Sequence, residues 1–105
     1  MTDKRIVLST AGSVEEARKI ARHLVEKKLA ACVNIVPQIE SIYRWQGKVE
    51  SSSEWLLLIK TTSGNVSSVE DAIRELHSYD LPECIAIVID GGSSEYLDWI
   101  GDSVE

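Results

Sequence analysis

Two long strand-type segments joined by a tight turn constrain the fold of this chain more than any other feature. Residues 32–45 and 48–62 carry the alternating and continuous apolar patterns of β-strands. Gln46-Gly47 between them is a two-residue hairpin signal, in which the glycine takes a positive φ angle. Both arms exceed the usual strand length of about 5–6 residues, so the hairpin should project past the core. Pro37 cannot donate a ladder hydrogen bond, which predicts an edge strand or a bulge at that position.

The segments on either side of this hairpin predict helices and further strands. Residues 4–11 predict a strand buried on both faces, because Ile6 to Leu8 are continuously apolar. A capping box, Ser13 with Glu16, precedes an amphipathic helix that should run to about residue 28. A second box, Ser67 with Glu70, predicts a helix that ends near residue 77. Residues 84–90 predict a buried strand, and Ser93 or Ser94 should cap a short final helix.

The order β-α-β-β-α-β with right-handed crossovers predicts one α+β domain over residues 1–105, a ferredoxin-like sandwich. It would have one antiparallel sheet, a long protruding hairpin and a C-terminal helix. The strands that begin at Cys32 and Cys84 would form opposite edges of the sheet, so the two cysteines should not meet within one chain. The unpaired edge of the strand 32–45 needs a cover, which favours an oligomer. In such an oligomer, Cys32 of one subunit could approach Cys84 of the next.

The excess of acidic residues limits the kinds of binding partner that the protein can have. Lys and Arg number 11 against 17 Asp and Glu, a net charge of −6, which disfavours nucleic acid and anionic membranes. No apolar run approaches the ~20 residues of a membrane span, and the run that follows Arg5 is too short for a signal peptide. The two cysteines form no C-x-x-C motif. We therefore expect a cytoplasmic protein with reduced thiols.

Five segments resemble the CutA divalent-cation tolerance proteins, in order and at the spacing of that family. They are Leu29–Pro37, Ser41–Lys48, Leu58–Thr61, His77–Ala86 and Tyr96–Ile100. The resemblance covers nearly the whole chain. It implies a ferredoxin-like fold assembled into a tight homotrimer through sheet pairing between subunits. It also implies a link to tolerance of copper and other divalent cations, with no established catalytic reaction.

The resemblance transfers only part of a metal site. In a bacterial relative for which copper ligands have been proposed, a cysteine ends the first strand and two consecutive histidines close the second helix. Here Ser9 stands at the first position and Leu76-His77 at the others. Of these positions only His77 retains a good ligand for copper(II) or another divalent cation. Apart from the resemblance, the thiolate of Cys32 is a second candidate ligand, because it could bind soft Cu(I). The alternatives are a helix-terminal histidine bonded to its neighbours and a cysteine packed as a small hydrophobe.

Aromatic, cationic and acidic residues around the hairpin could line a cleft between subunits that receives an anion or a small polar ligand. The cleft candidates are Tyr43, Trp45, Lys48, Lys60, Tyr79 and Glu83. The alternative for Tyr43 and Trp45, and the favoured one for Trp45, is packing across the strands that holds the hairpin or the trimer. Hard oxygen ligands are available from Glu40, Glu50, Asp80 and Glu83, whose alternative is solvated surface.

No catalytic constellation is recognisable, since the sequence holds only two histidines and no G-x-S-x-G, P-loop or G-x-G-x-x-G motif. Two function hypotheses follow, beside a third and least supported one, an enzyme that acts in the cleft between subunits. The first is a homotrimer that binds copper or other divalent metal ions in a response to those ions. The alternative is a trimeric small-ligand sensor or scaffold, with the architecture of the PII signalling proteins and no physiological metal role.

Overall fold

A computed structural model describes residues 2–105. The strands are β1 (Lys4–Ala11), β2 (Cys32–Trp45), β3 (Lys48–Thr62) and β4 (Ile85–Val88). The helices are α1 (Val14–Glu26), α2 (Val66–Leu76) and α3 (Ser94–Asp102), with a 3₁₀ turn at Ser63–Asn65 before α2.

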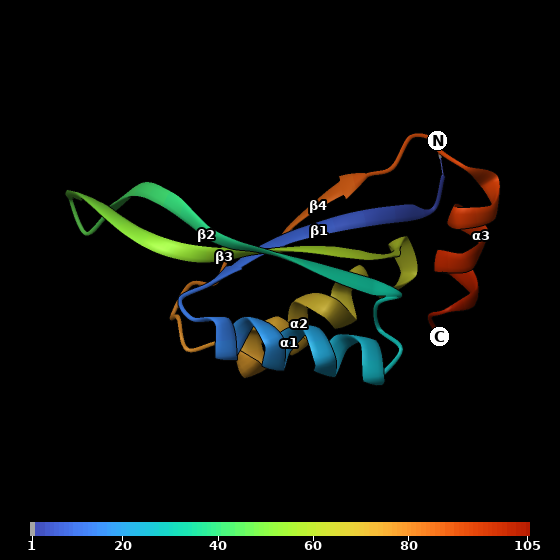
Figure 1. The fold of residues 1–105 in the computed structure, drawn as a ribbon, viewed down its shortest axis with the longest axis horizontal. Coiled ribbons are helices and arrows are strands. Elements are labelled where there is room, and N and C mark those ends of the chain that lie inside the picture. The colour runs from blue at the N-terminus through green and yellow to red at the C-terminus, as the bar shows by residue number, and fades with distance from the viewer. Residues whose placement is uncertain (1) are drawn as a thin grey trace.

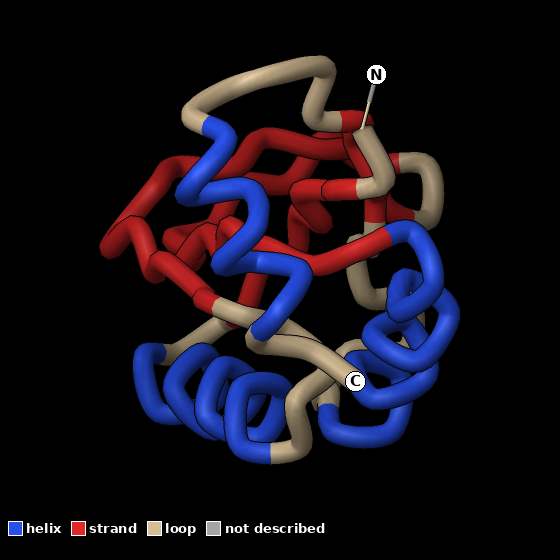
Figure 2. Tube along the Cα trace, turned by 90° about the vertical axis from the view of Figure 1, so that its right-hand side faces the viewer, coloured by secondary structure: helices blue, strands red, loops and turns tan. Residues whose placement is uncertain are grey.

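The sheet is antiparallel with strand order β2-β3-β1-β4, which confirms the ferredoxin-like prediction. Helices α1 and α2 cover one face of it, and the β2–β3 hairpin extends well beyond them (Figure 1). Seen from the end of the molecule that lies opposite the hairpin tip, α3 lies in front of the strands (Figure 2). Strands β2 and β4 form the two edges, so Cys32 and Cys84 are at opposite sides of the sheet, as predicted.

Helix α1 begins as its sequence predicts, whereas α2 does not. The Ser13 hydroxyl accepts a hydrogen bond from the Glu16 amide at 3.1 Å, which satisfies an amide that the first helical turn leaves free. The capping box predicted at Ser67 is wrong, because Ser67 lies inside α2. The 3₁₀ turn runs directly into the helix, and the Asn65 side chain donates back to the Thr62 hydroxyl instead.

A bulge in β2 decides which side chains face which way. The register with β3 shifts between Val36 and Ile39, as Pro37 predicts, and Gln38 takes a φ of 51°. The extra residue reverses the alternation of side chains in the distal part of the strand. Before the bulge Ile35 pairs with the buried Leu57, and after it Ile39 pairs with Glu54 on the other face.

The core lies between the sheet and helices α1 and α2. Fully buried side chains from β1, β3, α1 and α2 fill it, each of which stabilises the fold by about 1.5–3 kcal/mol relative to exposure. The larger ones are Val7, Ile20, Leu24, Leu57, Ile59, Val69 and Ile73. None of the helices within residues 2–105 is long and apolar enough to cross a membrane.

The opposite face of the sheet is apolar but uncovered by α1 and α2. Its cross-strand rows include Leu58, Leu8 and Ile85, and, one row further, Ile6 with Ile87. The prediction of a buried strand over 84–90 is wrong for the single chain. Strand β4 spans only four residues, and all of them are exposed. Its apolar composition belongs to a face that one chain leaves open.

Candidate functional site

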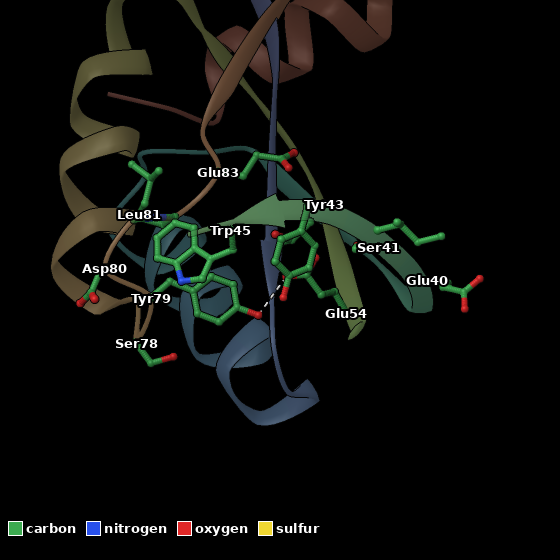
Figure 3. A pocket seen from close by; sticks show the side chains of 13 residues that line it. Glu40, Ser41, Tyr43, Trp45, Glu54, Ser78, Tyr79, Asp80, Leu81 and Glu83 are labelled. Atoms are coloured by element: carbon green, nitrogen blue, oxygen red, sulfur yellow. Dashed lines mark hydrogen bonds between the residues drawn. The ribbon is translucent and has the colours of Figure 1, made fainter. Parts of the chain in front are cut away.

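A cavity of about 890 Å³ lies where the hairpin meets the loop between α2 and β4 (Figure 3). Its lining comes from the end of β1, from both arms of the hairpin and from the loop. The lining residues are Thr10, Glu40, Ser41, Ile42, Tyr43, Trp45, Glu54, Ser78, Tyr79, Asp80, Leu81, Pro82 and Glu83. Because pockets for small organic ligands measure about 300–1,000 Å³, this cavity is large enough for one.

Two aromatic side chains of β2, Tyr43 and Trp45, line the cavity because of the bulge. Tyr43 pairs with Glu50 and Trp45 with Lys48 in the distal register, which puts both rings on the same face of the hairpin as Glu54. Without the extra residue, Tyr43 and Trp45 would share the face of Ile35. The bulge therefore turns Tyr43 and Trp45 toward the face that carries Glu54.

Glu54 and Tyr79 form the centre of the site. Glu54 is only 7% exposed, and it accepts a hydrogen bond of 2.9 Å from the Tyr79 hydroxyl. Burial and this contact with Glu54 raise the pKa of Tyr79 to about 12, so the phenol stays protonated and keeps donating. Gly12 makes the placement possible, since a Cβ there would lie 2.9 Å from the Tyr79 hydroxyl oxygen.

The charges that line the cavity are all negative. Besides Glu54 they are Glu40, Asp80 and Glu83, and no Lys, Arg or His of the described chain is among the lining residues. Burial, and then the charge of Glu54, raises the pKa of Glu83. Glu40 and Asp80 lie at the outer margins in Figure 3. The cavity is thus suited to a positively charged ligand.

His77 lies beside the cavity, in the interior. Its Nε2 is 2.6 Å from the Thr10 carbonyl oxygen, which can only accept, so Nε2 carries the proton. The Tyr79 amide donates to Nδ1 at 3.1 Å, and a Glu16 carboxylate oxygen lies 3.1 Å from the same nitrogen. The Tyr79 amide and the Glu16 carboxylate therefore both lie within hydrogen-bond distance of Nδ1.

The cysteines lie elsewhere. Cys32 is half-buried on the uncovered sheet face, next to Asn34, whose side-chain oxygen accepts a hydrogen bond from Lys60. Cys84 packs against the core, and its burial raises the pKa of the thiol. Within residues 2–105 no three His, Cys, Asp or Glu side chains are grouped so that they could hold a metal ion.

The structure brings together four of the six cleft candidates, Tyr43, Trp45, Tyr79 and Glu83. Lys48 and Lys60 are not part of the cavity lining, and neither is Glu50. The sequence reasoning missed Glu54. Its only signal was a carboxylate next to the continuous apolar run from Trp55 to Ile59, and the bulge in the neighbouring strand β2 hid which residues pair with it.

Fold and site define an α+β sandwich whose long hairpin covers an acidic, aromatic cavity. The family model of the CutA1 divalent ion tolerance protein matches residues 5–103. The "Divalent-cation tolerance protein CutA" of Thermus thermophilus is 49% identical over 100 residues, which cover 95% of this chain and 97% of the relative. A solved structure of the Thermus thermophilus protein superposes with a TM-score of 0.95 at 48% identity, covering 97% of this chain and 99% of that one.

A plant relative is longer. The chloroplastic CutA protein of Arabidopsis thaliana is 48% identical over 98 residues, which cover 93% of this chain but 54% of the relative. The matches over nearly the whole chain show that it belongs to the CutA1 divalent ion tolerance family. The relatives' names describe tolerance of divalent cations and no reaction.

Proposed function

We propose that the protein acts as a homotrimer in divalent-cation tolerance and binds copper(II) or another divalent cation weakly, without catalysis, in the cytoplasm. The trimer is supported by the uncovered apolar sheet face and by the two unpaired edges of the sheet. The free thiols of Cys32 and Cys84 fit a reducing compartment.

The observation that carries metal binding is the pair formed by His77 and Glu16. The 3.1 Å between Nδ1 and the carboxylate oxygen is a suitable span for two neighbouring ligands of one ion, each about 2.0–2.2 Å from it. The Ser78 hydroxyl, 3.2 Å from the same carboxylate oxygen, is a third polar group at the same place. A metal on Nδ1 displaces the Tyr79 amide, and that competition keeps the affinity low. Cys32 remains a candidate for a separate site on the uncovered sheet face.

Native mass spectrometry during a Cu(II) titration tests this proposal. The wild type should be a trimer that takes up one ion per chain at low excess. His77→Gln and Glu16→Gln should each lose that uptake, whereas His23→Gln, which alters the other histidine, should keep it. Unchanged stoichiometric uptake in His77→Gln would refute the site, and circular dichroism of each variant verifies that it is folded.

The cavity favours a second candidate function, a trimeric small-ligand sensor or scaffold. Its volume of about 890 Å³ and its three aromatic side chains suit an organic molecule better than a bare ion. Copper that adds only in a broad, nonstoichiometric series would make this candidate the better account.

A further inference from the structure

We propose that the cavity between the hairpin and the α2–β4 loop is a binding site for a small organic ammonium ion, whose charge Glu54 recognises. This inference rests on the small-ligand candidate function, for which it names the ligand class, and it does not require copper at His77.

Glu54 is a buried carboxylate, and few neighbouring groups compensate its negative charge. A desolvated carboxylate costs several kcal/mol unless a counter-charge or hydrogen bonds offset it. The Tyr79 hydroxyl supplies one hydrogen bond to one of the two oxygens, and the described part of the chain places no cation against Glu54. The nearby Glu83 adds a second negative charge to the same space. A cation in the cavity would stabilise both carboxylates.

The negative charge of the lining carboxylates excludes an anionic ligand, which the sequence had suggested for the cleft. Of the two lysines predicted for the cleft, Lys48 is absent from the lining and Lys60 is engaged with Asn34. A phosphate or carboxylate ligand would meet Glu54 and Glu83 without any lining cation. Such a ligand would be repelled in a partly desolvated site, where charge interactions are stronger than in water.

The aromatic lining favours an organic cation over a metal ion. Tyr43, Trp45 and Tyr79 offer π faces that attract ammonium groups, and Ile42, Leu81 and Pro82 offer apolar contact to a hydrocarbon body. Calcium and magnesium need about six or more oxygen ligands at short range. The described residues include no group of three metal-ligating side chains, so the cavity is not arranged for a bare ion.

The binding geometry follows from these positions. The ammonium group lies at Glu54, where the Tyr79 hydroxyl holds the carboxylate in place, and the hydrocarbon body lies along Trp45 and Tyr43. All of these side chains come from one chain, so each subunit carries a complete charge-recognition centre.

Three ligands of one shape test the charge preference: benzylamine, benzyl alcohol and benzoate, titrated at neutral pH into the isotopically labelled protein. Benzylamine should shift the amide resonances of residues 40–45, 54 and 78–83. Its affinity should exceed that of benzyl alcohol by about tenfold or more, as expected for a charge-assisted hydrogen bond. Benzoate should not bind.

Variants assign the recognition to Glu54. Glu54→Gln keeps an acceptor for Tyr79 and removes the charge, so the affinity for benzylamine should fall about tenfold while that for benzyl alcohol stays the same. Trp45→Leu should weaken benzylamine severalfold through the lost cation–π contact. Glu15→Gln, an equal change of charge on the exposed side of α1, should match the wild type.

The possible failures are distinguishable. Benzoate or benzyl alcohol binding in the cavity as tightly as benzylamine would overturn the ammonium assignment and leave the small-ligand function standing. If none of the three probes shifts the cavity resonances, both the assignment and the small-ligand function are refuted. Equal benzylamine affinity in Glu54→Gln and wild type would refute the role of Glu54 directly.

Discussion

His77 is held at both ring nitrogens, so its first contribution is structural. Its side chain is fully buried against Thr10, Glu16 and Tyr79. His77→Phe preserves the ring shape but leaves the Thr10 carbonyl and the Tyr79 amide without this partner. Since each buried group left unpaired costs about 1–3 kcal/mol, we expect the free energy of unfolding to fall by about 2–4 kcal/mol. Guanidinium unfolding measures it, and a loss no larger than that of His23→Phe would contradict this account.

Glu83 makes stability depend on pH. Burial and the charge of Glu54 raise its pKa in the folded protein above the ordinary 4.5, so the folded state holds this proton more tightly than the unfolded state. The contribution of Glu83 to stability is therefore present at pH 4 and is lost as the pH rises through the folded-state pKa.

Glu83→Gln should remove this loss. We expect the variant to melt at a higher temperature than the wild type at pH 7.5 and to show a smaller gain, or none, at pH 4. Thermal unfolding at both pH values and one fixed protein concentration measures the difference, with Glu15→Gln as the control for net charge. A gain of equal size at both pH values would rule out the titration of Glu83 as its cause.

At the scale of elements, the bulge in β2 stands on one strained residue. Gln38 has a φ of 51°, a left-handed conformation that costs a non-glycine residue about 1–2 kcal/mol. Gln38→Gly relieves this strain but gains freedom in the unfolded chain, so we expect a net stabilisation of about 0.5–1 kcal/mol. Gln38→Val should destabilise the protein, because β-branched residues tolerate this conformation least. Chemical unfolding of the two variants should give opposite signs, and equal effects would mean that this φ angle stores no strain.

The same bulge is the feature whose consequences could not be predicted from the sequence. Pro37 predicted an irregularity, and one was found there. Strict alternation of side chains along residues 32–45 would put Val33, Ile35, Ile39, Tyr43 and Trp45 on one face of the strand. The structure divides them, with the first two toward the core and the last three toward the face of Glu54. A pattern of period two cannot reveal a single inserted residue, and so it could not predict that Tyr43 and Glu54 share a cavity.

Helix α1 was predictable from local rules, namely the capping box at Ser13 and the apolar stripe of the helix. The strand order was predictable from the right-handedness of crossovers between parallel strands.

The prediction of β4 as a buried strand failed for a different reason. Its residues are apolar enough for a buried strand, yet Ile85 and Ile87 are exposed in the single chain. An apolar composition favours burial of a segment. It does not distinguish burial within one chain from burial between chains.

At the scale of the whole molecule, the uncovered face predicts that assembly stabilises the fold. Ile87 is 45% exposed in one chain, in the sheet row that also contains Ile6. If subunits cover this face, Ile87→Lys places an unpaired charge in the interface, which should dissociate the trimer and lower its melting temperature. Val25→Lys is the matched control, since Val25 on α1 is 40% exposed on the helical side of the molecule.

Native mass spectrometry with thermal unfolding at several protein concentrations separates the outcomes. The wild type and Val25→Lys should remain trimers whose melting temperature rises with concentration, because association stabilises only the folded chains. Ile87→Lys should be monomeric or unfolded, with a melting temperature well below that of Val25→Lys. If Ile87→Lys remains a trimer of wild-type stability, subunits do not meet on this face. The unpaired edges of β2 and β4 would then be the remaining contact surfaces.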